Sequence, residues 1–203
     1  MGVVHKRHVT SKHRFIGFVL IGLLVYILSN TVDEWKAFQG ATIAVYVVAI
    51  ASIILLTGYS GQISLGHGAL LAIGAYTAAL TQIYLHLPVW ICFIAAVLVT
   101  SLFGALLGSA AARLSGPYLA GTTLALAVGL PSIANQFSFL GGEQGISFDA
   151  GWPPLSFGEA FTQYKWFFWI TTLAALITLW WIQNLLRSRY GRMWRAVKTN
   201  EVA

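Results

Sequence analysis

A stretch of 76 residues without a formal charge, from Ala37 to Ala112, constrains this chain more than any other feature of its sequence. A second uncharged stretch follows from Leu114 to Gly142. Only 9% of the 203 residues are Asp, Glu, Lys or Arg, against about 25% in typical soluble domains, and 58% are hydrophobic. A soluble fold cannot cover its surface with so few charges. The composition therefore excludes a soluble enzyme, a disordered region and a disulfide scaffold, and it indicates a polytopic membrane protein.

Six apolar segments approach the length of about 20 residues that a membrane-spanning helix needs. They lie at about 15–29, 37–57, 69–85, 89–112, 118–136 and 166–186, and the first and third reach that length only with their ends included. A membrane barrel would need many alternating strands of about ten residues, whereas uninterrupted apolar runs fit helices. The expected fold is all-α: a polytopic transmembrane helical bundle with about six spanning segments.

The basic residues divide unequally between the two sides of such a bundle. With the N-terminus in the cytoplasm, the inner pieces hold ten of the twelve Lys and Arg residues, and the outer pieces hold only Lys36 and Lys165. The positive-inside rule predicts this orientation. The net charge of +6 then indicates orientation rather than nucleic-acid binding. The first apolar segment could be a cleavable signal peptide or a membrane anchor that stays attached. The residues after Leu28, "SNTVDEW", contain no small-x-small cleavage site, which favours the retained anchor.

These boundaries predict three parts of the chain. Residues 1–14 form a basic cytoplasmic N-terminus, residues 15–186 a transmembrane domain, and residues 187–203 a cytoplasmic segment. The single cysteine, Cys92, excludes an intrachain disulfide and is expected in the apolar core.

A glycine-rich break separates the second and third segments. Residues 57–76 read "TGYSGQISLGHGALLAIGAY" and place five glycines within seventeen positions, with polar residues among them. Irregular backbone is tolerated in a membrane only where it is buried in protein or lines a wet cavity, and broken helices with polar residues are typical of transport pathways. The candidate pathway residues are Gly58, Gly61, Gln62, Ser64, Gly66, His67 and Gly68. The alternative is tight packing of helices through small residues. A metal site at His67 is not expected, because no other ligand type lies at suitable spacing.

The segment "GYSGQISLGHGALLAIGAYTAAL" resembles the signature of the permease subunits of branched-chain amino-acid ABC importers. The resemblance is closer to the M-type permease of the pair, in a family shared with urea and short-chain amide permeases. The match is ordered and ungapped, and it includes Gly58, Gly61, Gln62, Ser64, Leu65, Gly66, Gly68, Gly74, Ala75 and Tyr76.

Residues 115–126, "SGPYLAGTTLAL", resemble the family's Gly-Pro-Tyr followed by Thr-Leu-Ala. The resemblance implies a helix start and pathway motif formed by Gly116, Pro117, Tyr118 and Thr123. Many family members carry an acidic and a basic residue further along this helix, where this chain has Val128 to Pro131. This departure leaves the identity of the solute open.

Two further glycine patterns precede the last segment. "LGGEQGI", residues 140–146, resembles an external family segment at Gly141, Gly142 and Gly145, although Leu140 stands where threonine is common. The resemblance implies contact with a solute-binding protein or a role in the outer gate; a solvated connector is the alternative. In the fourth segment, Gly104, Gly108 and Ala112 form a small-xxx-small stripe, which predicts close packing against another helix.

The tail "RSRYGRMWRAVKTNEVA" resembles the family's cytoplasmic coupling loop. The matching residues are Gly191, Arg195, Ala196, Asn200, Glu201 and Ala203. The resemblance implies a short helix that docks in a groove of the ATPase subunit. The alternative is attraction of the basic residues to anionic lipid, with Trp194 in the headgroup layer. Because family members continue past this loop with further spanning helices, we expect the sequence to be an N-terminal fragment.

The resemblance implies a permease subunit of an ATP-binding-cassette importer in the bacterial plasma (inner) membrane. It would move branched-chain amino acids or a related small polar solute by alternating access, without covalent chemistry and therefore not as an enzyme. The chain contains no G-x-x-x-x-G-K-[ST] loop, so no cofactor is expected here and ATP would be used by a partner subunit. The implied partners are a second permease, cytoplasmic ATP-binding subunits, a periplasmic or extracellular solute-binding protein and membrane lipid, but no nucleic acid.

Two other functions remain open at this point. An ion-coupled secondary transporter or channel is weakened because none of the six acidic residues lies within a predicted span, where such carriers often bury a carboxylate. A non-transporting membrane scaffold would not need the ordered glycine motif or the tail motif.

Overall fold

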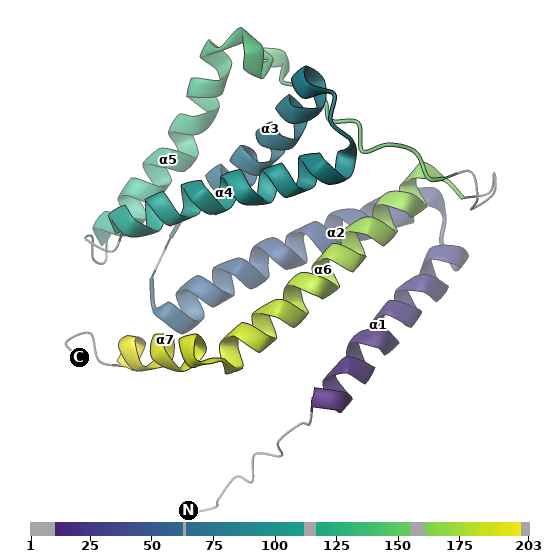
Figure 1. Ribbon diagram of the computed structural model, residues 1–203, viewed down its shortest axis with the longest axis horizontal. Helices are drawn as coiled ribbons and strands as arrows, with labels where there is room; N and C mark the ends of the chain where they lie inside the picture. The colour runs from purple at the N-terminus through teal and green to yellow at the C-terminus, as the bar shows by residue number, and fades with distance from the viewer. Residues whose placement is uncertain (1–10, 63, 112–116, 155–160, 200–203) are drawn as a thin grey trace, which may run out of the picture. The chain divides into compact units, whose positions relative to one another are not determined.

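The computed structural model describes residues 11–62, 64–111, 117–154 and 161–199, and these residues form helices and turns without a strand (Figure 1). The all-α prediction is confirmed. The elements are α1 (Ser11–Thr31), α2 (Glu34–Ile53), the π-helical η1 (Ile54–Ser60), α3 (His67–Leu85), α4 (Val89–Ala111), α5 (Pro117–Gln136), the 3₁₀ turns η2 (Ser138–Leu140) and η3 (Gly142–Gln144), α6 (Gln163–Arg187) and α7 (Arg189–Thr199).

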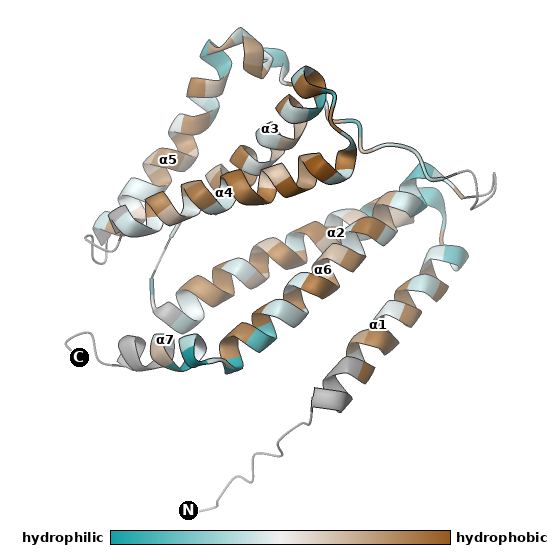
Figure 2. Cartoon of the chain, in the orientation of Figure 1, coloured by the Kyte–Doolittle hydropathy of each residue, from teal (hydrophilic) through white to brown (hydrophobic). Residues whose placement is uncertain are grey.

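Five helices among the described residues are long and apolar enough to cross a membrane. They are Glu34–Tyr59, His67–Leu85, Val89–Ser109, Tyr118–Gln136 and Gln163–Arg187, and the described apolar part of α1, Ile16–Thr31, is shorter. Helix α4 is hydrophobic along almost its whole length (Figure 2). Two of its large side chains, Val97 and Leu98, are more than 60% exposed, which a protein in water would avoid and lipid would cover. The expectation of a polytopic membrane protein is confirmed.

The described residues divide into two compact units. The first contains α1, α2 as far as Ala51, and α6. Helix α1 packs on α6, where the Trp169 indole Nε1 donates a hydrogen bond of 2.9 Å to the Ser29 hydroxyl. The same hydroxyl donates to the Tyr26 carbonyl, and the Tyr26 and Trp169 ring centroids lie 5.4 Å apart. Helix α2 meets α6 through Gly40, since a Cβ built there would lie 2.5 Å from the Phe168 ring.

The second unit contains residues 52–151 and 193–203, and it is organised around α3 and α4. These two helices lie side by side, and Gly74 allows the approach because a Cβ there would lie 3.0 Å from the Thr100 hydroxyl. Helix α5 packs on α3. The buried residues of this unit are small, apart from Leu119: Gly66, Ala69, Ala78, Ala79, Cys92 and Ala134. Small residues at helix interfaces are typical of membrane proteins, where close backbone contact replaces the hydrophobic effect.

We predict that the Ser29–Trp169 hydrogen bond couples α1 to α6. In a double-mutant cycle of Ser29→Ala, Trp169→Phe and the combined variant, the coupling free energy should be about 0.6 kcal/mol, as for other hydrogen bonds between membrane helices. Phenylalanine keeps a ring beside Tyr26, so the cycle isolates the indole N–H. The readout is the folded fraction after heating in detergent, followed by size-exclusion chromatography. Fully additive single effects would show that the two helices do not depend on this bond.

Candidate translocation site

The break between α2 and α3 is built by a change of helix type followed by irregular backbone. Helix α2 continues as the wider π-helical η1 from Ile54 to Ser60, and π-helical turns are frequent at functional sites. The chain leaves η1 at Gly61, whose φ of 74° lies in the left-handed region that glycine adopts without strain. Helix α3 begins only at His67. The predicted glycine-rich break between the second and third spanning segments is therefore confirmed.

A hydrogen bond from the backbone ties the break to α5. The Leu65 N–H donates to the Thr123 Oγ1 at 3.0 Å, and the Thr123 hydroxyl donates to the Leu119 carbonyl at 2.9 Å. Beside it, Gly66 is buried, and a Cβ there would lie 3.1 Å from the Cβ of Thr123. Two motifs that lie 58 residues apart in the chain thus meet at one point. The sequence marked each motif separately but contained no signal that they touch.

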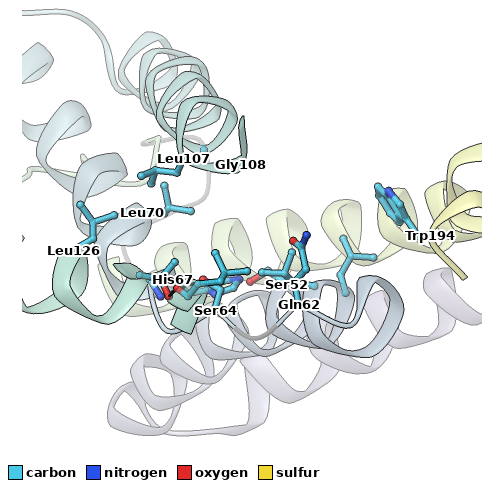
Figure 3. Close-up of a pocket in the computed structure, with 15 residues that line it drawn as sticks. Ser52, Gln62, Ser64, His67, Leu70, Leu107, Gly108, Leu126 and Trp194 are labelled. Atoms are coloured by element: carbon cyan, nitrogen blue, oxygen red, sulfur yellow. Dashed lines mark hydrogen bonds between the residues drawn. The ribbon is translucent and has the colours of Figure 1, made fainter. Parts of the chain in front are cut away.

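A cavity of about 480 Å³ opens beside this contact, within the second unit. Polar residues of the break and its flanks, Ser52, Gln62, Ser64 and His67, lie along one side of it, and Leu70, Leu107 and Leu126 lie on the other (Figure 3). The remaining lining residues are Leu55, Leu56, Gly66, Gly104, Gly108, Leu119, Thr123 and Trp194. None of these residues is an Asp, Glu, Lys or Arg, so the described part of the lining offers dipoles and apolar surface without a fixed charge.

His67 carries an unpaired polar atom at this site. Its Nδ1 is buried and has no hydrogen-bond partner among the described residues. Nearby, the Ser64 hydroxyl accepts a hydrogen bond of 3.3 Å from the Gly66 N–H. No three His, Cys, Asp or Glu side chains of the described residues come close enough together to hold a metal ion. The polar groups here can bind a solute through hydrogen bonds, and none of them forms a nucleophile–base pair.

The structure brings only some of the predicted pathway residues into the cavity. Gln62, Ser64, Gly66, His67 and Thr123 line it. Gly58 lies within η1, Gly61 follows its last residue, and Gly68 lies in the first turn of α3, where a Cβ would meet open space; none of the three is in the cavity lining. Pro117 begins α5 as expected of a helix start, and its neighbour Tyr118 is 76% exposed, outside the cavity lining. Gly116 lies outside the described residues.

Sequence reasoning missed several residues of the cavity, and it assigned two of them another role. Gly104 and Gly108 were expected to pack against a helix, but a Cβ at either position would have no described atom within 4 Å. Both glycines line the cavity instead. Their spacing of four residues places both on one face of α4, and this shared face was the sequence signal that could have indicated a common role at the cavity. Ser52, Leu70, Leu107 and Leu126 carried no signal, because they are ordinary residues of apolar helices.

The glycines of the segment 140–146 form a tight turn. Gly141, Gly142 and Gly145 all have φ between 56° and 85°, and a Cβ on Gly141 would overlap the Gly145 carbonyl. These glycines are therefore explained by the backbone. The segment after the turn is held on α3, where the Gln82 side chain donates to the Asp149 carbonyl at 2.5 Å and accepts from the Asp149 N–H at 2.8 Å.

The tail forms a helix after a sharp turn. Helix α6 ends at Arg187, Ser188 is extended, and α7 starts at Arg189. Gly191 is buried in this turn, where a Cβ would lie 2.2 Å from the Leu186 carbonyl oxygen. By helical register, Tyr190, Met193 and Trp194 lie on one face of α7, and Arg189 and Arg192 lie away from it. Arg195 and Ala196 lie in α7 with undescribed side chains, and Asn200, Glu201 and Ala203 lie outside the described residues.

Comparison with known proteins gives consistent matches. Residues 37–203 match the family described as "branched-chain amino acid transport system / permease component". The chain is 32% identical over 181 residues to the high-affinity branched-chain amino acid transport system permease protein LivM of Salmonella typhimurium, and 31% identical to LivM of Escherichia coli. In both cases the match covers 78% of this chain and 43% of the relative. No solved structure matches the chain significantly.

We predict that Thr123→Val destabilises the second unit more than Thr122→Val. Both hydroxyls donate to carbonyls of their own helix, but only Thr123 also accepts from the break, so only its loss leaves the Leu65 N–H unpaired. The expected difference is about 1 kcal/mol, the net contribution of one intramolecular hydrogen bond.

The fully buried Cys92, the only cysteine, supplies the readout. A fluorogenic maleimide reacts with it only after the unit opens, so the labelling midpoint on heating in detergent measures stability. Equal midpoints for the two variants would show that the break does not depend on Thr123.

Proposed function

The chain belongs to the family of permease components of branched-chain amino-acid transport systems, and from this premise we propose that it works in the membrane permease of an ATP-binding-cassette importer. The proposed solute is a branched-chain amino acid or a related small polar molecule, which crosses the plasma (inner) membrane by alternating access. The observation that carries the proposal is the uncharged cavity beside the broken helix, because both family motifs reach it through the contact of Leu65 with Thr123.

The geometry suggests how a conformational change would reach the cavity. The Leu65–Thr123 hydrogen bond and the tight approach of Gly66 attach one wall of the cavity to α5. A displacement of α5 would therefore move the break with it. Because an equilibrium shifts only through differential binding, the inward and outward states must differ in their affinity for the solute, for ATP or for the binding protein.

The ends of the helices supply surfaces for the proposed partners. On the cytoplasmic side, α7 is the segment proposed to dock on the ATP-binding subunit, which would hydrolyse ATP on behalf of this non-enzymatic chain. On the outer side, the turn at Gly141–Gly145 is proposed to face the solute-binding protein. A second permease would complete the pathway. The N-terminus is proposed to be cytoplasmic, since ten of the twelve Lys and Arg residues then face inward.

We predict that Gly61→Leu impairs uptake while leaving membrane insertion intact. A leucine in the left-handed region costs about 1–2 kcal/mol, so the initial rate of leucine uptake in cells that supply the partner subunits should fall on the order of tenfold. Gly17→Leu, in α1 where the position has open space, is the matched control and should transport normally.

The same assay separates the importer from an ion-coupled carrier. Uptake should stop when the ATPase partner carries an inactivating substitution, and it should continue when ionophores collapse the ion gradients. The reverse pattern would reject the importer in favour of the ion-coupled alternative.

We predict that Arg195→Glu prevents copurification of the ATP-binding subunit. Arg189→Glu makes the same charge change in the same helix, but at a position outside the resemblance to the coupling loop, so it should retain the partner. Affinity purification from detergent-solubilised membranes, with both proteins quantified, measures the loss. If both variants lose the partner equally, the helix acts through its total charge, and specific docking is rejected.

A further inference from the structure

The lining of the cavity comes from one end of the spanning helices. The chain reverses direction between consecutive spans, so the end of α2 with η1, the start of α3, the end of α4 and the start of α5 lie toward the same side of the membrane. The lining follows these ends. It takes Ser52, Leu55 and Leu56 from before the break, His67 and Leu70 from the start of α3, Gly104, Leu107 and Gly108 from the last turns of α4, and Leu119, Thr123 and Leu126 from the first half of α5. In the orientation proposed above, this is the cytoplasmic side.

One lining residue, Trp194, comes from a different part of the chain. Every other residue of the described lining falls between positions 52 and 126, whereas Trp194 lies in α7. Helix α7 follows α6, which spans in the same direction as α2 and α4, so α7 begins on the side toward which the cavity lies. Figure 3 shows the indole coming from α7, and Trp194 belongs to the same compact unit as the rest of the lining.

Trp194 is shielded more than its neighbours on the same face of α7. Tyr190 and Met193 are both more than 60% exposed, whereas Trp194 is half-buried. The three residues share a face by helical register, so the position of α7 as a whole does not explain the difference. The shielding therefore belongs to the place of the indole in the cavity lining.

The glycines of α4 leave space at the same end of the cavity. Gly104 and Gly108 line the cavity, and a Cβ at either position would have no described atom within 4 Å. Protein interiors are otherwise packed closely, with few voids larger than a water molecule. A bulky side chain can change position only where such space exists, so the glycine pair provides what a movable indole needs.

On the basis of the function proposed above, in which α7 docks on the ATP-binding subunit, we propose that Trp194 is an inner lid. Its indole closes the cytoplasmic end of the cavity, and a shift of α7 withdraws it. Trp194 belongs both to α7 and to the cavity lining, so the ATP-binding subunit would act on the cavity through one side chain, without a relay through other helices.

The chemistry of an indole suits a side chain that alternates between two positions. Its ring is apolar enough to lie against Leu55 and Leu56 of the lining, and its N–H is stable at a wet boundary. The closed and open positions can therefore lie close in free energy. This closeness is required of a lid, because a partner shifts such an equilibrium only by the difference in its affinity for the two states.

A cysteine placed in the cavity tests the lid. Gly104→Cys puts a thiol in the lining where the Cβ has open space, and Gly108→Cys, one turn nearer the end of α4, repeats the measurement. The probe is a charged methanethiosulfonate that does not cross membranes, added to vesicles with the cytoplasmic side outward. The native Cys92 is fully buried and stays unlabelled while the chain is folded. Each lid variant without the added cysteine therefore serves as its own folding control.

Removing the indole should open the cavity to the probe. Trp194→Ala should raise the initial labelling rate of Gly104→Cys on the order of tenfold, which corresponds to losing the burial of roughly 60 Å² of apolar surface, about a third of what an aromatic side chain can bury. Trp194→Phe keeps a ring and should stay close to the parent. Tyr190→Ala, on the same face of α7 but outside the lining, is the matched control and should change nothing.

The assembled complex tests whether the ATP-binding subunit operates the lid. With the partner subunits present, ATP should change the labelling rate of Gly104→Cys in the parent and have no effect once Trp194 is alanine. If ATP changes both rates equally, the nucleotide acts on the cavity by another route and the lid is rejected as its link.

Failure of the lid and failure of the importer give different results. If Trp194→Ala leaves the labelling rate unchanged, or if the probe never reaches the thiol from the cytoplasmic side, the lid is rejected, even when leucine uptake depends on the ATPase. If the rate rises with Trp194→Ala but uptake does not depend on the ATPase, the indole still closes the cavity and the importer is rejected.

Discussion

The hydrogen bond from the Leu65 N–H to the Thr123 hydroxyl is the interaction on which the candidate site depends. Within a membrane, backbone that leaves the helical pattern must find partners inside the protein or at a wet cavity. Residues 61, 62 and 64–66 leave that pattern, and Thr123 supplies a partner from another helix. The same contact joins the break to α5 at the cavity, since Thr123 also belongs to the lining.

A lipid environment explains why large apolar residues are exposed in this structure while small residues are buried. In water, large apolar side chains collect in the core, but here Val97 and Leu98 are exposed while Ala69, Ala78 and Ala79 are buried. Because lipid is as apolar as leucine, helices gain more from close approach through small residues than from burying large ones. The few interhelical hydrogen bonds, such as that of Trp169 with Ser29, then select which helices pair.

The glycines show how the same residue type serves different physical needs. Gly61 and the turn at Gly141 require positive φ, whereas Gly40, Gly66 and Gly191 lie where another part of the chain comes close to the position of a Cβ. Gly104 and Gly108 meet neither need and line the cavity. Sequence spacing predicted packing for these two, because a small-residue stripe looks the same whether it faces a helix or a space.

By itself, the sequence determined the all-helical membrane fold, the approximate positions of five spanning helices, the position of the break and the family. Each of these follows from local properties: long uncharged apolar runs, clustered glycines and ordered motifs. Only the tertiary structure decided that Thr123 holds the break, that Leu70, Leu107 and Leu126 line the cavity, and that His67 Nδ1 has no partner among the described residues. These facts depend on which residues distant in the chain meet in space, and apolar helices look alike in sequence whichever face they turn toward a cavity.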